Sequence, residues 1–334
     1  MPSSRILGVG YSLPDDVLPN SFFAERNPYY LYDTHGKPLR DTHGTLMEKH
    51  LDAEGIFQVT GIRERRKIAA DEDVHHLAAR AAHQALVHAR TNPCDLEGII
   101  VASVTNRQRF PCVADRVKGM LGATHAHYCF DIAAACAAFP YALDLADKHV
   151  RDTGKPCLAV AAEAVTRLTD YEGRDINSTL FGDGAGAALV GPPSSQCGGV
   201  MGFAFHTDPN DLIAQDDEGH LRMPEGGAVL RYAIRGMHAL TQELHATLGW
   251  AADDVALYIP HQANGRIIEG YRKKLGVGPE RVLNIIQEYG NMSAATCAVG
   301  LAQAIASKLV GAGDKVILAS VGSGFKISAA ALVL

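Results

Sequence analysis

The amino-acid sequence predicts an α/β protein built from two copies of one βα unit, with mostly parallel central sheets covered by helices. Stretches with apolar residues at helical spacing alternate with short, continuously apolar stretches, which are typical of strands buried on both faces. Both kinds recur in the same order in the two halves of the chain. A helix followed by a strand that opens near an aspartate occurs once per half, at Asp95 and Asp254. This alternation is typical of sheets that carry helices on their faces.

The first half, residues 1–192, ends at Pro192 and Pro193. Residues 20–51 are aromatic and charged without a clear period, so we expect an excursion with some helix that lies over a surface or an opening. The expected strands are residues 5–9, 95–104, 128–132, 156–165 and 185–190, and the expected helices are residues 73–89, 113–121 and a segment that starts near residue 136.

The second half, residues 193–334, repeats this order. The chain length of 334 residues suggests about two domains or one large duplicated one. The expected strands are residues 199–204, 253–260, 281–286, 314–320 and 326–334, and the expected helices are residues 230–249, 265–275 and 294–310.

The composition indicates a globular protein of a reducing compartment. Hydrophobic residues make up 47% and charged residues 20%, which allows a large core. The net charge of -6 shows no footprint for nucleic acid. Seven scattered cysteines without a C-x-x-C pair predict neither a disulfide framework nor a zinc site. No export signal opens the sequence, and residues 294–313 are too polar to span a bilayer, so we expect a cytoplasmic protein with no membrane partner.

Cys136 is the strongest candidate for a nucleophile. It follows the predicted strand in the stretch F-D-I-A-A-A-C-A-A-F, and an amphipathic helix begins there. Pro140 fits, because proline is tolerated in the first helical turn. The peptide dipoles at a helix start favour an anion, so we expect the Cys136 thiol to ionise more easily than a free cysteine. A buried structural cysteine is the alternative.

Three other polar segments follow predicted strands, where loops build sites in α/β folds. His261 and Asn264 lie in Y-I-P-H-Q-A-N, and Asn291 lies in Y-G-N-M-S-A-A-T. The turn G-S-G-F at 322–325 joins the last two strands and can offer backbone N–H groups to an oxyanion. A single histidine in such a loop is more often structural, so the combination with Cys136 and Asn291 supports catalysis.

Two further patterns suggest sites that the sequence context disfavours. F-G-D-G-A-G-A at 181–187 matches part of a dinucleotide fingerprint, but a strand follows it in place of a helix. Close backbone packing beside the Cys136 loop explains its glycines better. The histidine pairs at 75–76 and 125–127 have no carboxylate or thiol at ligand spacing, so we expect no metal site.

These motifs resemble the thiolase superfamily, and most closely the β-ketoacyl-acyl-carrier-protein synthase III group. They occur in the family order over nearly the whole chain, which makes the resemblance specific. It implies a thiolase-like duplicated fold layered αβαβα, with an N-terminal half at 1–192 that carries an insertion at about 20–54, and a C-terminal half at 193–334. The matching motifs are T-G-I-R-E-R-R (60–66), A-A-A-C-A-A-F (133–139), F-G-D-G-A-G-A, H-Q-A-N (261–264), G-N-M-S-A-A (290–295) and G-S-G-F.

The resemblance implies a role for each residue. Cys136 would hold an acyl group as a thioester, and the N–H groups of Cys136 and Gly324 would stabilise the oxyanion. His261 and Asn291 would bind the thioester carbonyl of a malonyl-type extender. No cofactor is implied beyond the coenzyme A or phosphopantetheine that carries the substrate. For substrate binding, the resemblance points to Asn264, to Phe325 and to Phe110, which would cross a homodimer interface to close the partner's acyl pocket.

The chain departs from the family where coenzyme A would bind. The tryptophan and arginine that usually precede T-G-I are replaced by Gly55 and Val59, and an arginine expected shortly before F-G-D-G-A-G is displaced or absent. The acyl group therefore arrives on an acyl carrier protein, or coenzyme A binds differently. A basic segment after H-Q-A-N would dock an acidic carrier protein, although a merely solvated helix face explains it equally well: Arg266, Arg272, Lys273 and Lys274.

The leading functional prediction is a decarboxylative Claisen condensation, in fatty acid initiation or in specialised metabolism. One alternative keeps the acyl-enzyme but transfers the acyl group to a hydroxyl or an amine. A second alternative is an inactive partner subunit of a synthase heterodimer. Retention of Cys136, His261 and Asn291 together argues against that inactive subunit.

Overall fold

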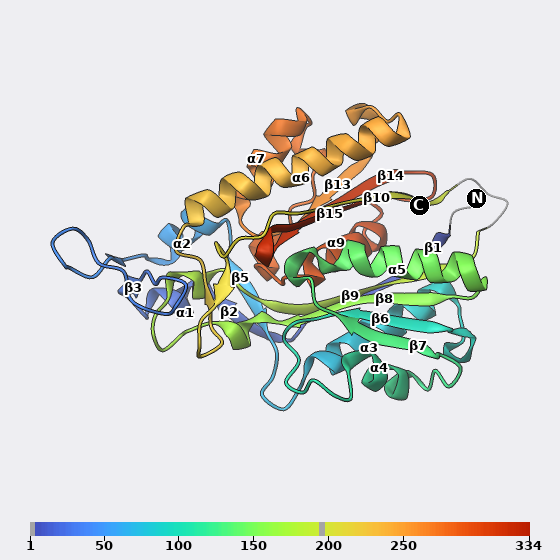
Figure 1. Ribbon diagram of the computed structural model, residues 1–334, viewed down its shortest axis with the longest axis horizontal. Helices are drawn as coiled ribbons and strands as arrows, with labels where there is room; N and C mark the ends of the chain where they lie inside the picture. Colours follow the sequence, from blue (N-terminus) through green and yellow to red (C-terminus); the bar gives the residue numbers. More distant parts are fainter. Residues whose placement is uncertain (1–3, 194–197) are drawn as a thin grey trace.

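The computed structural model describes residues 4–193 and 198–334, and Figure 1 shows its layers. Cys197 lies outside the described residues; the other six cysteines are free thiols. Within the described part of the chain, no helix is long and apolar enough to cross a membrane. The order of the layers is helices, sheet, helices, sheet, helices, so the predicted layered α/β fold is confirmed.

The first sheet contains five strands in the order β1-β9-β8-β6-β7. The pairs β8–β6 and β6–β7 are parallel, whereas β1–β9 and β9–β8 are antiparallel. Every residue of β8 and β9 is buried, as continuously apolar strands between two helical layers require. The strands are β1 (Arg5–Ser12), β6 (Gly98–Ala102), β7 (Tyr128–Ile132), β8 (Cys157–Ala164) and β9 (Asp183–Gly191).

The second sheet contains four strands in the order β10-β15-β14-β13, and only β13–β14 is a parallel pair. Short two-stranded ribbons flank the main sheets at β2–β5, β3–β4 and β11–β12. The main strands are β10 (Gly199–Thr207), β13 (Leu257–Pro260), β14 (Lys315–Gly322) and β15 (Lys326–Val333). The ribbon strands are β2 (Asp16–Pro19), β3 (Tyr29–Tyr30), β4 (Glu48–Lys49), β5 (Glu64–Lys67), β11 (Ala214–Gln215) and β12 (Leu221–Arg222).

Three helical layers cover the sheets. Helices α3 and α4 pack on the outer face of the first sheet, and α6 and α7 on the outer face of the second. Helices α5 and α9 lie between the sheets, and one apolar cluster there joins residues of both halves. The helices are α1 (Asn20–Ala24), α2 (Ala53–Thr60), α3 (Val74–Ala89), α4 (Val113–Leu121), α5 (Ala138–Thr153), α6 (Gly226–Leu248), α7 (Gly265–Leu275), α8 (Ile286–Tyr289) and α9 (Ala295–Ala306).

Short 3₁₀ turns occupy several loops, and four of them contribute residues to the lining of the cavity described below. They are η1 (Pro93–Asp95), η2 (Ala135–Ala137), η3 (Val165–Leu168), η4 (Ile176–Thr179), η5 (Ala252–Asp254), η6 (Pro279–Arg281) and η7 (Ser323–Phe325).

The expectation of mostly parallel sheets needs correction, because three of the seven pairings in the two main sheets are parallel. Strands β14 and β15 are joined only by Ser323–Phe325, and a connection this short allows an antiparallel pair but no crossover. Between β8 and β9 the chain forms only the turns η3 and η4, again without a crossover helix. Both sheets are therefore mixed.

The strand expected at residues 281–286 is wrong. Only an isolated bridge between Tyr258 and Val282 forms there, before α8 begins. The side chain of Gln262 takes the place of a neighbouring strand: its amide donates to the carbonyl of Leu283 at 3.1 Å and accepts from the N–H of Ile285 at 2.9 Å. The segment is thus held by a side chain and not by a ladder.

The excursion at residues 20–51 packs against the loop that follows β8, as an element lying over a surface should. Leu18, Phe23, Tyr29 and Ile56 form a small core of their own, and Tyr171 and Ile176 from that loop pack against it. Figure 1 shows this region projecting from the layered body. The division into two domains at residue 192 stays a prediction.

Candidate active site

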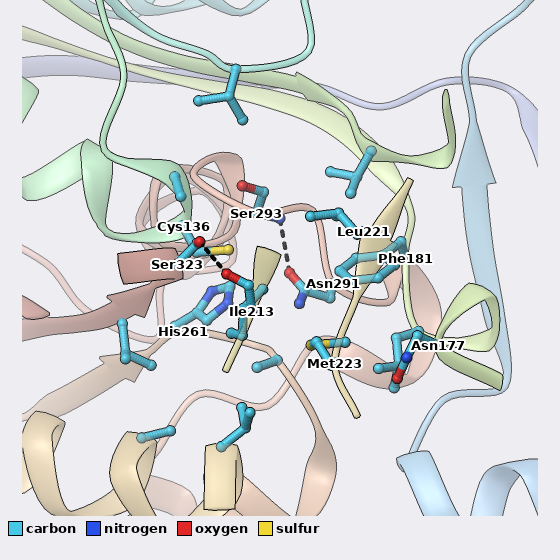
Figure 2. Close-up of a pocket in the computed structure, with 18 of the residues that line it drawn as sticks. Cys136, Asn177, Phe181, Ile213, Leu221, Met223, His261, Asn291, Ser293 and Ser323 are labelled. Atoms are coloured by element: carbon cyan, nitrogen blue, oxygen red, sulfur yellow. Dashed lines mark hydrogen bonds between the residues drawn. The ribbon is translucent and has the colours of Figure 1, made fainter. Parts of the chain in front are cut away.

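A cavity of about 430 Å³ lies between the two halves, and Cys136, His261 and Asn291 all line it. These three residues come from the turn before α5, the loop after β13 and the turn before α9. Figure 2 shows their side chains turned toward the same space. Segments that are far apart in the sequence therefore meet at one cavity; Cys136 and His261 follow strands as predicted, whereas Asn291 follows helix α8.

The second half holds the Cys136 turn in place. The hydroxyl of Ser320 on β14 donates to the carbonyl of Cys136 at 2.7 Å, and that of Ser328 on β15 donates to the carbonyl of Ala137 at 2.7 Å. Gly322 lies so close that a Cβ there would stand 2.8 Å from the backbone nitrogen of Cys136. The nucleophile of one half thus sits on the strands of the other.

His261 is neutral in this structure. Its ring is buried, with 1% of its surface exposed, and its Nδ1 has no hydrogen-bond partner. Burial lowers the pKa of His261 to about 3, since nothing nearby compensates the cost of a buried cation. A neutral imidazole can donate a single N–H bond to a ligand, but it is a weak base at pH 7.

Asn291 is fixed by both its backbone and its side chain. Its N–H donates to the carbonyl of Leu180 at 2.9 Å, and its own carbonyl accepts from the N–H of Gly182 at 3.1 Å. The side-chain oxygen accepts from the N–H of Ser293 at 2.9 Å, as Figure 2 shows. That bond uses the oxygen and leaves the NH₂ group as the donor for a ligand carbonyl.

The F-G-D-G-A-G-A segment forms no phosphate loop, because β9 begins at Asp183. Its glycines allow close packing: a Cβ on Gly182 would stand 2.3 Å from the carbonyl of Tyr289, and one on Gly186 would stand 2.5 Å from the backbone of α9 at Ala298. The expected close packing is therefore present, but it is against the Asn291 turn and α9 and not beside the Cys136 loop.

The expectation that Cys136 ionises more easily than a free cysteine is wrong. Burial raises the pKa of the Cys136 thiol to about 11, although the hydroxyl of Ser293 acts in the opposite direction. The nearby charge of Glu163 raises the thiol pKa further. The physical reason is that the α-helix begins only at Ala138, and burial outweighs the dipole at its start.

Backbone strain is concentrated around the cavity. Among the described residues other than glycine, six have positive φ, and three of these line the cavity: Ala135 (47°), Ser293 (49°) and Phe325 (34°). Such conformations persist only where the surrounding structure enforces them, and they occur often at functional sites. Gly324, the predicted oxyanion donor, lies beside Phe325 with φ 67° and also lines the cavity.

The predicted substrate-binding residues separate into two groups. Phe325, fully buried, and Asn264, which caps α7 by accepting from the N–H of Arg266 at 2.8 Å, both line the cavity. Phe110 does not line it and is 83% exposed in this single chain. Its predicted role requires a second copy of the chain.

The basic residues after H-Q-A-N differ in their freedom to meet a partner. Arg272 donates to both carboxylate oxygens of Glu269 at 2.7 Å and to the carbonyl of Val277 at 2.7 Å. Lys273 stands 3.5 Å from Glu269 as well. Arg266 and Lys274 are exposed. The guanidinium of Arg272 is bonded to Glu269 of its own helix and to the turn that follows the helix, so it is the weakest of the four docking candidates.

Apolar side chains of one short segment form a further wall of the cavity, which is called the roof below. It is carried by the ribbon β11–β12, whose Leu221 and neighbouring Ile213 and Met223 line the cavity. The hydroxyl of Ser323 donates to the carbonyl of Ile213 at 2.6 Å and ties the roof to the G-S-G-F turn.

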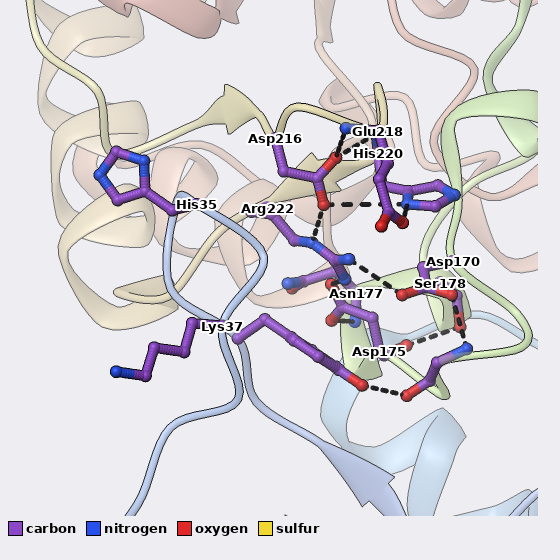
Figure 3. A network of polar contacts seen from close by, with 12 residues as sticks. His35, Lys37, Asp170, Asp175, Asn177, Ser178, Asp216, Glu218, His220 and Arg222 are labelled. Atoms are coloured by element: carbon purple, nitrogen blue, oxygen red, sulfur yellow. Dashed lines mark hydrogen bonds and ion pairs between the residues drawn. The ribbon is translucent and has the colours of Figure 1, made fainter.

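Arg222 anchors this roof. Arg222 is buried, with 2% of its surface exposed. Its guanidinium donates hydrogen bonds to three carboxylates: Asp216 at 2.7 Å, Asp175 at 2.8 Å and Asp170 at 2.9 Å (Figure 3). The ring of Tyr32 from the excursion lies 4.3 Å from the guanidinium. The excursion, whose residues do not line the cavity, thus supports the roof from behind.

Sequence analysis missed three residues of this region: Glu163, Ser293 and Arg222. Glu163 has a visible signal, because it is the only charged residue in the apolar strand C-L-A-V-A-A-E-A. Ser293 follows Asn291 by two residues in a motif that was recognised. Arg222 has no clear local signal, because only Asp216 lies near it in the sequence, whereas Asp170 and Asp175 lie in a distant segment.

The fold and this pocket define a thiolase-fold protein with a cysteine, a histidine and an asparagine in one cavity. Residues 130–209 match the family model for 3-oxoacyl-[acyl-carrier-protein] synthase III, and residues 245–334 match the model for its C-terminal part. The chain belongs to the β-ketoacyl-[acyl-carrier-protein] synthase III family.

Relatives of this family match nearly end to end. The enzyme of Aquifex aeolicus is 35% identical over 96% of both chains, and that of Natranaerobius thermophilus is 32% identical over 97% of both. A crystal structure of the Aquifex enzyme covers 99% of this chain and 100% of its own, with a TM-score of 0.87. The priming β-ketosynthase of the R1128 polyketide pathway is 30% identical, covering 99% and 96%, with a TM-score of 0.85.

Proposed function

We propose that this chain is a β-ketoacyl synthase. It loads an acyl group from a thioester onto Cys136 and condenses it, with loss of carbon dioxide, with a malonyl-type thioester. The pathway is fatty acid initiation or specialised metabolism; relatives of both kinds, a synthase III and a polyketide priming synthase, match the whole chain. The observation that carries the proposal is the convergence of Cys136, His261 and Asn291 on one cavity.

In the first step the sulfur of Cys136 attacks the thioester carbonyl and the donor thiol leaves. The N–H groups of Cys136 and of the Gly324 turn stabilise the tetrahedral oxyanion. Two features favour this step: the backbone of Cys136 is fixed by the Ser320 hydroxyl, and Gly324 lines the same cavity. The acyl chain then extends under the apolar roof, past Phe325.

In the second step His261 and Asn291 bind the thioester carbonyl of the extender. Each supplies one N–H donor, which suits an enolate oxygen that gains charge as carbon dioxide leaves. The low pKa of His261 supports this role, because a neutral imidazole keeps its N–H donor without adding a buried positive charge. The enolate carbon then attacks the acyl group on Cys136. No metal or redox cofactor takes part.

Release of carbon dioxide tests this reaction against the alternatives. Enzyme loaded with an acyl group should release labelled carbon dioxide from malonyl thioester and form a β-ketoacyl product, and the Cys136→Ala variant should form none. If the acyl group is instead transferred to a hydroxyl or an amine and no carbon dioxide is released, the enzyme is a simple acyltransferase and not a condensing enzyme. Absence of any acyl-enzyme would favour an inactive partner subunit.

The acyl donor is proposed to arrive on a carrier protein. Gly55 and Val59 lie on α2, which meets the start of α7 so closely that a Cβ on Gly61 would stand 3.0 Å from Gly265. Neither residue supplies an aromatic ring or a guanidinium for adenine. Arg266 and Lys274 on α7 offer exposed positive charge to an acidic partner. Faster loading from coenzyme A thioesters than from matched carrier thioesters would overturn this proposal.

A homodimer completes the proposed site. Phe110 is 83% exposed, which is unusual for a large aromatic side chain in a monomer, and contact with a second copy would cover it. Sedimentation of the wild type and of the Phe110→Ala variant, together with their acyl-chain preference, tests this role. A wild type that remains monomeric would contradict it. We also propose a cytoplasmic location.

A further inference from the structure

The cavity contains one charged side chain that the reaction described above does not use. Among the described residues that line the cavity, Lys326 is the only lysine, arginine, aspartate or glutamate. The other lining side chains are uncharged, His261 included, because burial keeps its imidazole neutral. Lys326 is the first residue of β15, directly after Phe325, and it is partly buried.

The register of the second sheet places the Lys326 side chain on the face that carries the Cys136 turn. Lys326 lies opposite Gly322 in the pairing of β14 with β15, and two residues further along Ser320 lies opposite Ser328. Directly opposed residues, and residues two apart, project from the same face of a sheet. From this face the hydroxyls of Ser320 and Ser328 donate to carbonyls of the Cys136 turn, at 2.7 Å each. The lysine side chain therefore starts beside the backbone that holds the nucleophile.

The amine of Lys326 lies at the G-S-G-F turn without a counter-charge. Its Nζ is 3.3 Å from the position that a Cβ on Gly324 would take, and Gly324 also lines the cavity. Within the described part of the chain, Lys326 forms no ion pair, whereas Lys315 at the other end of the same two strands stands 3.7 Å from Asp254. A lysine amine carries three N–H donors. A carboxylate that enters the cavity can therefore pair with Lys326.

The strand order separates this amine from the site of the extender. The second sheet runs β10-β15-β14-β13, so Lys326 on β15 and His261 after β13 lie on opposite sides of β14. The backbone of Cys136 is bonded to Ser320 of β14, between the two. A cation beside the malonyl carboxylate would also stabilise the ground state and oppose the loss of carbon dioxide. The carboxylate that suits Lys326 therefore belongs to the acyl group on Cys136.

We propose that Lys326 binds a carboxylate at the far end of the acyl group, so that the acyl donor is the half-thioester of a dicarboxylic acid. The inference rests on the proposed acyl loading of Cys136. The loaded chain has a thioester at one end and an ammonium–carboxylate pair at the other, and its methylene groups lie against the apolar lining. A neutral chain of equal length leaves the amine unpaired, so the site discriminates against it.

Competition between matched donors tests this inference. The wild type is offered equal amounts of a dicarboxylic half-thioester and a neutral acyl thioester of the same carbon number, both on the same carrier: succinyl with butyryl, glutaryl with pentanoyl, and adipyl with hexanoyl. Intact mass spectrometry gives the ratio of the two adducts on Cys136. At the chain length that reaches the amine, the carboxylated adduct should exceed the neutral one at least tenfold, since a hydrogen bond to a charged group contributes about tenfold to hundredfold in affinity.

Three variants separate charge pairing from packing. Lys326→Met keeps the length of the side chain and removes the charge, so the adduct ratio should fall at least tenfold. Lys326→Arg keeps the cation and should retain a preference for the carboxylated donor. Lys315→Met is the matched control, because Lys315 belongs to the same two strands but does not line the cavity. Its adduct ratio should match the wild type.

Equal loading of both members of every donor pair by the wild type would overturn the inference. So would an adduct ratio that Lys326→Met leaves unchanged, including an equal loss of both adducts, which marks a contact with the carrier arm or a structural role.

Protection of Cys136 supplies a test that needs no acyl transfer. Pentanoate should slow the alkylation of Cys136 by iodoacetamide more than pentanamide does in the wild type, and this difference should disappear in Lys326→Met. If no donor forms an adduct with the wild type, the proposed function fails, and protection alone decides whether the cavity binds a carboxylate at Lys326. Protection by pentanoate that is equal in the two proteins would then contradict the inference.

Discussion

The floor and the roof of the cavity are built in different ways. The floor carries Cys136 and His261 on turns bonded to strand β14, and Asn291 on a turn bonded to the segment just before β9, beside one apolar core shared by both halves. The roof is the short ribbon β11–β12, and it is held by one arginine with three carboxylates. The comparison teaches that the reacting groups depend on packed, regular structure, whereas the shape of the acyl cavity depends on a local ion cluster.

Removing the arginine of the roof should give the largest change in stability. The Arg222→Met variant leaves three buried carboxylates without their cation, and breaking a buried ion pair costs about 3–5 kcal/mol. Chemical denaturation measures this loss. Lys148→Met is the control, because Lys148 forms a pair with Asp144 at 2.7 Å but its side chain is 61% exposed; surface pairs contribute about 1 kcal/mol or less.

The same variant tests the separation of the two regions. If Arg222→Met still acylates Cys136 under folding conditions, the floor keeps its geometry without the roof anchor. Loss of acylation in a protein that retains its wild-type circular dichroism would show that the roof also shapes the nucleophile.

Within the floor, Asn291→Ala should separate the two chemical steps. It removes one donor to the developing enolate, and removal of one such donor typically costs about 10²–10³-fold in rate. We expect carbon dioxide release to fall by this amount while acyl loading of Cys136 changes only a few-fold. Asn264→Ala is the comparison, since that side chain caps α7 and also bonds the carbonyl of Val59 at 3.3 Å. Equal loss of loading and condensation in Asn291→Ala would contradict this assignment.

The floor should also make stability depend on pH through Glu163. Burial raises its pKa from 4.5 to about 7, so the folded state binds this proton more tightly than the unfolded state does. Its favourable contribution is therefore complete below pH 4.5 and is lost as the pH rises through 7. Unfolding free energies of the wild type should fall relative to Glu163→Gln over this window, by roughly 3–4 kcal/mol at about 1.4 kcal/mol per pKa unit. If the difference in unfolding free energy between the wild type and Glu163→Gln does not change with pH, this contribution is contradicted.

Shortening a roof side chain should change the acyl preference more than the rate. Leu221→Ala enlarges the cavity by about three carbons, and a methylene in a hydrophobic pocket changes discrimination by roughly 10–200-fold. We expect longer or branched donors to gain about tenfold over short ones in competition for Cys136. Leu309→Ala, at an apolar residue that is 61% exposed and outside the cavity lining, should leave the preference unchanged.

The smallest effect is expected at the outer surface of α7. Lys274→Glu should slow loading from a carrier-protein thioester by about two- to fivefold at low salt, because rim charges act mainly on association. Loading from a coenzyme A thioester should not change. Arg272→Ala should have less effect on carrier loading than Lys274→Glu, since Arg272 is bonded to Glu269. If Arg272→Ala slows carrier loading more than Lys274→Glu does, the carrier protein docks on a different surface.

The sequence predicted the floor far better than the roof. Apolar strands and helices with a clear period gave β7, α4 and α7 their observed bounds. The strand-end rule held for Cys136 and His261, whereas Asn291 reaches the same cavity from a turn that follows α8. The thiol pKa was wrong, since burial depends on the packing of the other half over Cys136.

The sequence also could not predict where side chains take the place of backbone pairing between strands. Gln262 holds residues 283–285 in place of a strand, which no local pattern indicates. The roof was missed for a related reason: Asp216 lies near Arg222 in the sequence, but Asp170 and Asp175 belong to the other half and meet Arg222 only in the folded chain. Local periodicity carries no information on such distant pairs.

The most direct test of the account is intact mass spectrometry of the enzyme after incubation with a panel of acyl thioesters. The account predicts a single acyl adduct on Cys136, absent in Cys136→Ala, that disappears with release of carbon dioxide when malonyl carrier-protein thioester is added. An adduct on another residue, or an adduct on Cys136 that persists with malonyl thioester and leaves carbon dioxide unreleased, would contradict it.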